Sequence, residues 1–119
     1  MHAIWGAGLM SLTKLIVVVD ADCNVHDYNE VAWRAFGNVD YGRDVVHSEG
    51  PVDHLDHGSY EQFYGGKLGL DATRKLPTEG YHRGWPTECV LEDDTLATVD
   101  RRWAEYGIDA PSKGWFRRR

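Results

Sequence analysis

The sequence predicts an α/β fold: a three-layer domain with a small, mostly parallel sheet and a βαβ unit. Residues 15–19 are an unbroken run of Leu, Ile and Val. A strand that is apolar at every position is typical of a parallel sheet covered on both faces. Residues 28–37 then carry apolar side chains at helical spacing, and a second strand-like segment follows at 44–49. Strand, helix and strand in this order make a βαβ unit.

The helix over 28–37 has clear start and stop signals. Asp27 precedes it as a good N-cap, and Glu30 stands three residues later, which is the pattern of a capping box. Gly37 or Asn38 ends it, because both residues tolerate the left-handed conformation that closes many helices. The apolar face of this helix is expected on the sheet.

Two aspartates follow the apolar strand. Asp20 and Asp22 stand at the edge where a parallel sheet presents its ligand-binding loops. Carboxylates at this place could hold Mg²⁺. We favour a structural role, in which they accept hydrogen bonds from N–H groups of the loop and the helix. The Gly69, Asp71 and Thr73 turn, some fifty residues later, is grouped with Asp20, Asp22 and Asp27 as structural motif residues.

The segment 50–66 is rich in Gly, Asp, His and Tyr and is predicted to be a long loop. A loop of this length in a small domain is usually functional or interfacial. Within it, Asp53, His54, Asp56 and His57 form the most ligand-like cluster, suited to Zn²⁺ or Mn²⁺. A catalytic zinc needs a third protein ligand at fixed geometry, so we assign no metal site and keep His54 and His57 as weak candidates. An independent metal- or ligand-binding module built on this loop is the alternative function.

Composition excludes several classes of protein. The net charge of −6 argues against a nucleic-acid surface. The longest apolar run is too short to span a bilayer, so no membrane partner is expected. Two cysteines do not make a disulfide framework and no signal peptide precedes the domain, which favours the cytoplasm. No activated nucleophile or acid–base pair is visible, so no residue is predicted to be catalytic.

The chain resembles the C-terminal domain of the UbiD-type carboxy-lyases over about residues 3–107. The segments that carry the resemblance, in order, are 13–25, 31–33, 43–44, 51–56, 66–75, 85–86 and 99–103. The resemblance divides the chain into 1–13, the remnant of a linker or helix with a glycine turn, and 14–107, the α/β domain. Residues 108–119 are expected to be a flexible basic tail.

The resemblance implies a reversible decarboxylase of aromatic or α,β-unsaturated acids that uses prenylated FMN, Mn²⁺ and K⁺. The catalytic residues and metal ligands of the family belong to a part that this sequence does not contain, so the chain alone is expected to be inactive and to bind no cofactor. Two segments are implied to face the active site. Gly50, Pro51, Val52 and Asp53 should line the substrate pocket as a lid. Gly6, Ala7 and Gly8 should lie near the cofactor's phosphate.

The resemblance also implies a partner. The C-terminal domain carries much of the dimer contact in the family, so we expect self-association or docking on a UbiD-type catalytic chain. Met1 falls where a full-length relative continues a helix or linker. A separate small subunit, a truncated fragment and a gene remnant all remain compatible with the sequence.

Overall fold

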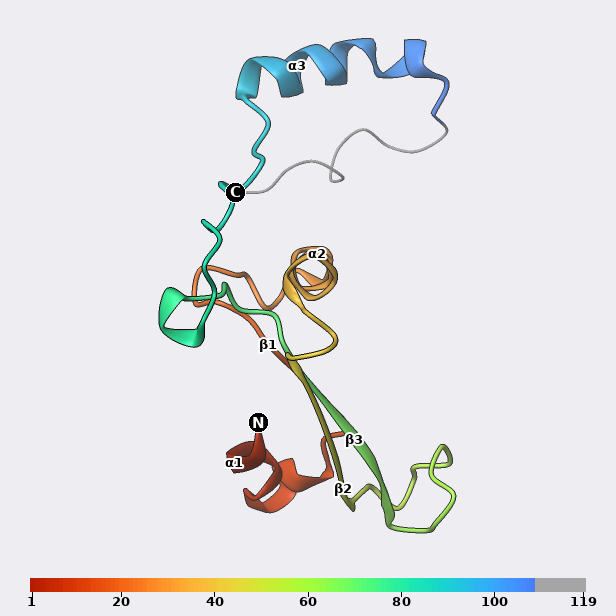
Figure 1. Ribbon diagram of the computed structural model, residues 1–119. Helices are drawn as coiled ribbons and strands as arrows, with labels where there is room; N and C mark the ends of the chain where they lie inside the picture. The colour runs from red at the N-terminus through yellow and green to blue at the C-terminus, as the bar shows by residue number, and fades with distance from the viewer. Residues whose placement is uncertain (109–119) are drawn as a thin grey trace. The chain divides into compact units, whose positions relative to one another are not determined.

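The computed structural model describes residues 1–108, and the predicted basic tail at 108–119 lies almost wholly outside them. The chain divides into two compact units, residues 1–82 and residues 83 onward (Figure 1). The first unit contains α1 (His2–Trp5), η1 (Gly8–Leu12), β1 (Leu15–Val18), α2 (Tyr28–Asn38), β2 (Val45–Pro51), β3 (Tyr64–Asp71) and η2 (Pro77–Glu79). The second contains α3 (Asp93–Arg102) and η3 (Trp103–Tyr106). No helix among the described residues is long and apolar enough to cross a membrane.

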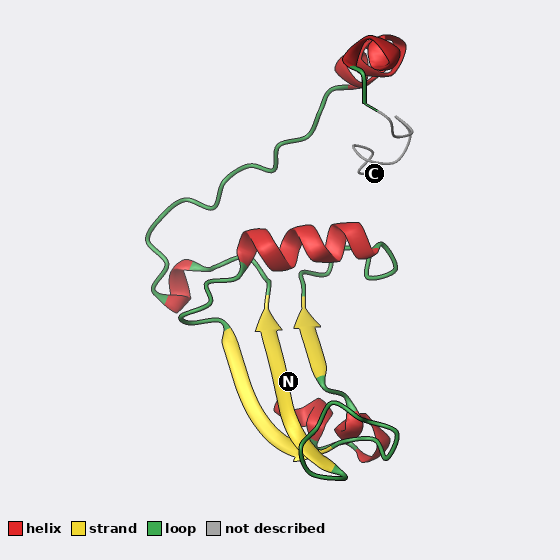
Figure 2. Cartoon of the chain, turned by 90° about the vertical axis from the view of Figure 1, so that its right-hand side faces the viewer, coloured by secondary structure: helices red, strands yellow, loops and turns green. Residues whose placement is uncertain are grey.

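The predicted α/β class is confirmed, and the sheet is mixed. Its strand order is β1-β3-β2, with β1 parallel to β3 and β2 antiparallel to β3 (Figure 2). The expected βαβ unit between 14–19 and 44–49 is therefore wrong in its pairing, because α2 leads from β1 to a strand of opposite direction. The reason is that β2 and β3 are joined as a hairpin by the loop 52–63, and a hairpin makes its strands antiparallel.

The central strand is β3 rather than the apolar run at 15–19. Within the described sheet β1 lies at an edge, and the Leu15 residue is 55% exposed. Three glycines and a lysine in β3 weaken its strand signal in the sequence, since these residues are depleted in strands. Gly69 has a packing reason: a Cβ there would collide with the Met1 side chain and lie 3.3 Å from the Trp5 ring.

Helices cover both faces of the sheet, as a three-layer domain requires. Gly69 lies against α1, whereas its neighbour Leu70 packs with Ala35 of α2. Because successive strand residues point to opposite faces, α1 and α2 lie on opposite sides. Figure 2 shows α2 lying across the ends of β1 and β3. The core on the α2 side consists of Ala35, Val39 and Ala72, with Val17, Val19, Val45 and Leu70 packed against it.

Asp27 is the N-cap of α2, and its Oδ1 accepts hydrogen bonds from the N–H groups of Asn29 and Glu30 at 2.9 and 3.3 Å. The predicted capping box forms only in part. The Glu30 side chain accepts from the Asn24 N–H at 3.2 Å and so closes the preceding loop. Phe36 remains 78% exposed, so the helix buries a narrower stripe than its apolar pattern indicates.

A buried ion pair fixes the ends of β2 and β3. Lys75 Nζ lies 2.8 Å from Asp44 Oδ2, and both side chains are about as buried as any in the domain, at 5% and 4% exposure. Lys75 also donates to the Asp71 carbonyl at 3.0 Å, and Asp44 Oδ2 accepts from the Asp40 N–H at 2.9 Å. Each charge thus has hydrogen-bond partners, which a buried pair needs.

Replacing Lys75 by methionine tests this pair. The Lys75→Met variant leaves the Asp44 carboxylate buried without its cation, so we expect the free energy of unfolding to fall by about 3–5 kcal/mol in urea titration. Arg43→Met is the matched control, because Arg43 reaches the same carboxylate at 3.5 Å from a side chain that is 43% exposed. Its cost should stay below about 1 kcal/mol. Equal losses in the two variants would contradict the assignment.

Candidate functional site

A buried lysine joins the base of the predicted lid to the segment that follows the glycine turn. Lys67, on β3, is 4% exposed. Its Nζ donates hydrogen bonds to the backbone carbonyls of Ser11, Thr13 and Pro51 at 2.5, 3.2 and 2.7 Å. Ser11 and Thr13 belong to the segment that follows the glycine turn, and Pro51 ends β2. One ammonium group therefore holds the N-terminal segment against the base of the predicted lid.

The four predicted lid residues do not form one loop. Gly50 and Pro51 are the last residues of β2, and Val52 is 3% exposed with its N–H donating to the Phe63 carbonyl at 3.1 Å. A Cβ at Gly50 would lie 3.2 Å from Lys67 Cε, so a glycine here leaves room for the lysine chain. Asp53 is exposed, and its Oδ1 accepts from the Leu55 N–H at 2.8 Å. The base of the lid is thus held, and the exposed connection to β3 starts at Asp53.

The glycine turn lies between α1 and η1. Gly6, Ala7 and Gly8 are all exposed, and Gly8 has a φ of 51°, with open space where its Cβ would be. The turn is positioned by the Trp5 indole, which donates from Nε1 to the Thr13 carbonyl at 3.0 Å. The Thr13 carbonyl also accepts from Lys67, so the turn and the lid base share one support.

The charge on Lys67 is balanced between opposing effects. Carbonyl acceptors favour the ammonium form. Burial, followed by the nearby positive charge of Lys14, nevertheless lowers the pKa of Lys67 below its ordinary value of 10.5. Because the unfolded chain binds this proton more tightly, the stability that depends on Lys67 rises with pH between the folded pKa and 10.5.

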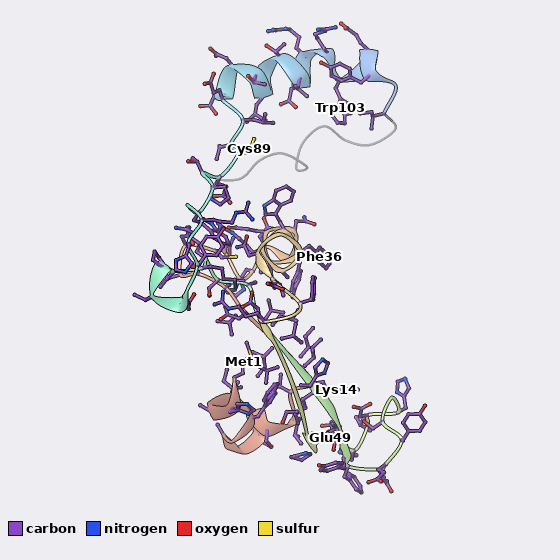
Figure 3. All side chains as sticks on the ribbon, viewed as in Figure 1. Met1, Lys14, Phe36, Glu49, Cys89 and Trp103 are labelled. Atoms are coloured by element: carbon purple, nitrogen blue, oxygen red, sulfur yellow. The ribbon has the colours of Figure 1, made fainter. Side chains whose placement is uncertain are left out.

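A second lysine anchors the loop after the lid. Lys14 Nζ lies 2.7 Å from Asp56 Oδ2, and Asp56 Oδ1 accepts from the Gly58 N–H at 2.7 Å. The hydrogen bond from Lys14, followed by that from Gly58, lowers the pKa of Asp56. Figure 3 labels Lys14 close to the end of the sheet from which this loop departs. Both carboxylate oxygens of Asp56 are therefore engaged in contacts within the fold.

The histidines of this loop are not brought together with further ligands. His54 Nδ1 lies 3.5 Å from Asp53 Oδ1. Within residues 1–108, no three His, Cys, Asp or Glu side chains are grouped so that they could hold a metal ion. No described contact joins His54 to His57. The arrangement gives the alternative metal-binding module no support beyond its sequence.

The structural motif residues hold the acidic turn. Asp20 Oδ2 accepts from the Arg74 N–H at 3.0 Å, and the Arg74 guanidinium pairs with Asp22. Asp71 Oδ1 accepts from both the N–H and the hydroxyl of Thr73, at 3.0 and 2.6 Å. Burial acts to raise the pKa of Asp71, but the two bonds from Thr73 lower it overall. Arg74, which connects both carboxylates of the turn, is a residue that the sequence motif alone did not identify.

An open hollow of about 710 Å³ lies beside Lys67 at the loop end of the sheet. Its lining comes from all three strands and the residue before β1. It comprises Lys14, Leu15, His47, Ser48, Glu49, Gly66, Lys67 and Leu68. Figure 3 labels Lys14 and Glu49 at this end of the sheet. Lys67 lies in the wall of this hollow. Its only signal in the sequence is a lone lysine among the uncharged residues 64–70.

Comparison with known proteins gives a consistent result. The family model described as the 3-octaprenyl-4-hydroxybenzoate carboxy-lyase C-terminal domain matches residues 1–72. An uncharacterized protein of Archaeoglobus fulgidus is 49% identical over 106 residues, which are 88% of this chain and 22% of that protein. One of Aquifex aeolicus is 44% identical over 108 residues, again 22% of its length. The chain thus spans about a fifth of the relatives it matches.

Solved structures show the same relationship. The UbiD-class enzyme HmfF from Pelotomaculum thermopropionicum, in complex with FMN, is 34% identical with a TM-score of 0.54, covering 71% of this chain and 20% of that one. The closed form of the vanillic acid decarboxylase of Sedimentibacter hydroxybenzoicus has a TM-score of 0.66 at 21% identity, covering 91% of this chain and 23% of that one. The second likeness concerns the fold.

The Lys67 contacts can be removed in one step. In Lys67→Met three carbonyls lose their donor, and we expect the free energy of unfolding at pH 7 to fall by about 2–4 kcal/mol in urea titration. The rise of stability with pH toward 10.5 should vanish as well, because the titrating group is gone. Lys14→Met is the control, since the Lys14 side chain is 47% exposed. A Lys67→Met variant as stable as Lys14→Met would refute the assignment.

The Lys14–Asp56 contact predicts a pKa. We expect the pKa of the Asp56 carboxyl in the intact chain to lie below its ordinary value of 3.8. The titration is measured by the NMR resonance of the carboxyl carbon. In Lys14→Met the pKa should move back toward 3.8, and the Gly58 bond should keep it from returning fully. The contribution of this pair to stability is present above 3.8 and is lost as pH falls through the folded pKa. An unchanged pKa in the variant would rule out the contact in solution.

Proposed function

The chain belongs to the family of 3-octaprenyl-4-hydroxybenzoate carboxy-lyase C-terminal domains, and we propose that it forms the substrate-pocket lid and an oligomerisation surface of a UbiD-type decarboxylase. The match over residues 1–72 includes the whole sheet, the glycine turn and the lid base. The substrates of such an enzyme are aromatic or unsaturated carboxylic acids. The catalytic groups belong to the remaining part of the enzyme, and this chain supplies position rather than chemistry.

The observation that carries the proposal is the placement of Lys67. A lid must open and close over a pocket from a fixed base, and Lys67 fixes Pro51 to the segment after the glycine turn. Asp53 is then the first exposed residue beyond this base, at the start of the 53–63 connection. In this proposal the loop from Asp53 excludes water from bound substrate, while Val52 stays packed below it.

The glycine turn at residues 6–8 fits a place beside the cofactor. The glycine turn is exposed, and the absence of side-chain bulk at Gly8 lets backbone approach a phosphate closely. In the complete enzyme prenylated FMN would supply the decarboxylation chemistry, and the catalytic chain would hold it together with Mn²⁺ and K⁺. Residues 6–8 of this chain would contact the cofactor only at its phosphate end.

Docking can be tested by complementation. HmfF lacking its matching fifth is mixed with the intact 119-residue chain, and we expect a complex that co-purifies, retains flavin absorbance and decarboxylates the HmfF substrate. Asp53→Ala should leave co-purification unchanged and raise KM by about threefold to tenfold, the size of one lost contact to substrate. His57→Ala is the matched loop control and should change neither.

Two results would count against the proposal. If the shortened HmfF folds and binds flavin but never co-purifies with the chain, docking is excluded. If docking occurs and Asp53→Ala, like His57→Ala, leaves KM unchanged, the chain is a structural subunit without a lid. Circular dichroism of the shortened HmfF alone verifies that it is folded, as the first of these results requires.

A further inference from the structure

The 53–63 connection is attached to the sheet at its middle. All of its residues belong to the described part of the chain, and only Asp56 and Ser59 among them are partly buried. Asp56 is the partner of Lys14, and the Asp56 side chain is 10% exposed. Lys14 in turn is fixed to the central strand, because its carbonyl accepts from the Leu68 N–H at 2.8 Å. One ion pair therefore ties the connection to the sheet itself.

Ser59 makes the second inward contact, and a glycine provides the space for it. A Cβ at Gly65 would collide with Ser59 Oγ and lie 3.1 Å from Ser59 Cβ. A Cβ at Gly58 would likewise lie 3.2 Å from Asp56 Oδ1 and 3.4 Å from Lys14 Nζ. Glycines thus accommodate both contacts that hold the connection down. We call these two contacts, the Lys14–Asp56 pair and the packing of Ser59 on Gly65, the latch.

The connection rejoins β3 through a strained residue. Phe63 has a φ of 68°, in the left-handed region that a bulky side chain rarely adopts. It is the third residue of a tight turn, in which the Tyr64 N–H donates to the Glu61 carbonyl at 3.5 Å, and glycine or asparagine is usual there when φ is positive. No other non-glycine residue within 1–108 has a positive φ. Strain of this kind persists where surrounding contacts impose it, and it is common in segments that change conformation.

We propose that the 53–63 connection exchanges between a latched and a released conformation, in which the latch holds it on the sheet and the strain at Phe63 favours release. This inference rests on the lid role proposed above, and it names what holds the lid and what opens it. In the released conformation Lys14 leaves Asp56, and the φ of Phe63 returns to a negative value. The conformation described here is the latched one.

The opposing terms are of similar size. The Lys14 side chain is 47% exposed, and an ion pair with an exposed partner stabilises a structure only slightly, because water screens the charges. The left-handed conformation of Phe63 costs a comparable amount. Since neither term dominates, both conformations are populated. A lid that admits substrate and then covers it requires such a balance.

The structure leaves space for this movement. An open hollow of about 450 Å³ lies between the connection and the end of the β2–β3 hairpin. Its lining from the connection comprises Gly58, Ser59, Tyr60 and Glu61, and its lining from the sheet side comprises Lys14, Glu49, Tyr64, Gly65 and Gly66. Figure 1 shows the connection turned back beside the end of β2 and β3. The connection therefore lies over part of the sheet without filling the space beneath it.

The ion pair is tested by the fraction of molecules in which the connection is released. For the intact chain, NMR relaxation dispersion of the amides at 54–60 should show exchange on the microsecond to millisecond timescale. Lys14→Met should raise the released fraction about twofold to fivefold, the size expected for one partly exposed ion pair. Asp56→Asn should do the same, because it keeps an acceptor for the Gly58 N–H but loses the charge. His57→Ala, in the same connection, is the matched control and should leave the fraction unchanged.

The second contact is tested by a double-mutant cycle. Gly65→Ala should raise the released fraction about tenfold, because the new methyl group collides with Ser59. Ser59→Gly removes both atoms of that collision. The effect of Gly65→Ala should therefore disappear once Ser59 has been replaced by glycine. Urea unfolding of each variant verifies that the fold is retained.

The strain is tested at Phe63 in the Lys14→Met background, where the released fraction is larger. Phe63→Gly removes both the ring and the cost of a positive φ, so it should lower the released fraction about tenfold. Phe63→Ala removes the same ring but keeps a Cβ and hence the strain, and it should not lower the fraction. The difference between these two variants isolates the backbone effect from the loss of the side chain.

Each result supports or overturns a separate step. Absence of exchange at 54–60 in the intact chain and in every variant overturns the proposal. If Lys14→Met raises the released fraction no more than His57→Ala does, the ion pair is not part of the latch. Equal effects of Phe63→Gly and Phe63→Ala overturn the role of strain. The proposed function is decided by complementation of HmfF, so a latch that releases in a chain that never docks would stand without a substrate lid.

Discussion

The first unit depends on one buried ammonium group. Lys67 reaches through the space that Gly50 leaves open and donates to carbonyls from two distant segments. Without it, the chain before β1 and the end of β2 would have no shared hydrogen-bond donor, and three carbonyls would lose theirs. The lowered pKa of Lys67 shows that this burial is opposed by desolvation. A costly group is retained here because a single cation can satisfy several carbonyls at once.

The sequence identified local features where a single residue has one clear physical role. Asp27 is the cap of α2 because its carboxylate satisfies two free N–H groups at the first turn. The predicted strand at 15–19 also exists, since a run of β-branched residues has few other stable conformations. Its place in the sheet could not be predicted, because pairing depends on β3, where Gly69 is explained by the Met1 and Trp5 side chains packed against it.

The candidate site divides in the same way. The positions of Gly50 to Asp53 came from the family resemblance, and nothing in their own pattern distinguishes the packed Val52 from the exposed Asp53. Lys67 was visible as a residue but not as a link, because its three acceptors lie 16 to 56 positions away. Contacts between main-chain carbonyls and a distant side chain leave no periodic signal. The Asp53–His57 cluster shows the converse, in that proximity in sequence did not produce a shared geometry.

Among the described residues, the three charged groups with clearly shifted pKa values each have a structural role. A catalytic acid or base needs a shifted pKa together with access to a substrate. Asp71 is shifted, but its Oδ1 holds Thr73 and closes a turn. Asp56 is shifted because Lys14 binds it, and Lys67 is shifted while enclosed by carbonyls. In each case the interaction or burial that moves the pKa also occupies the group. The perturbed charges thus hold the sheet, the turn and the loop in place, as the proposed positioning role requires.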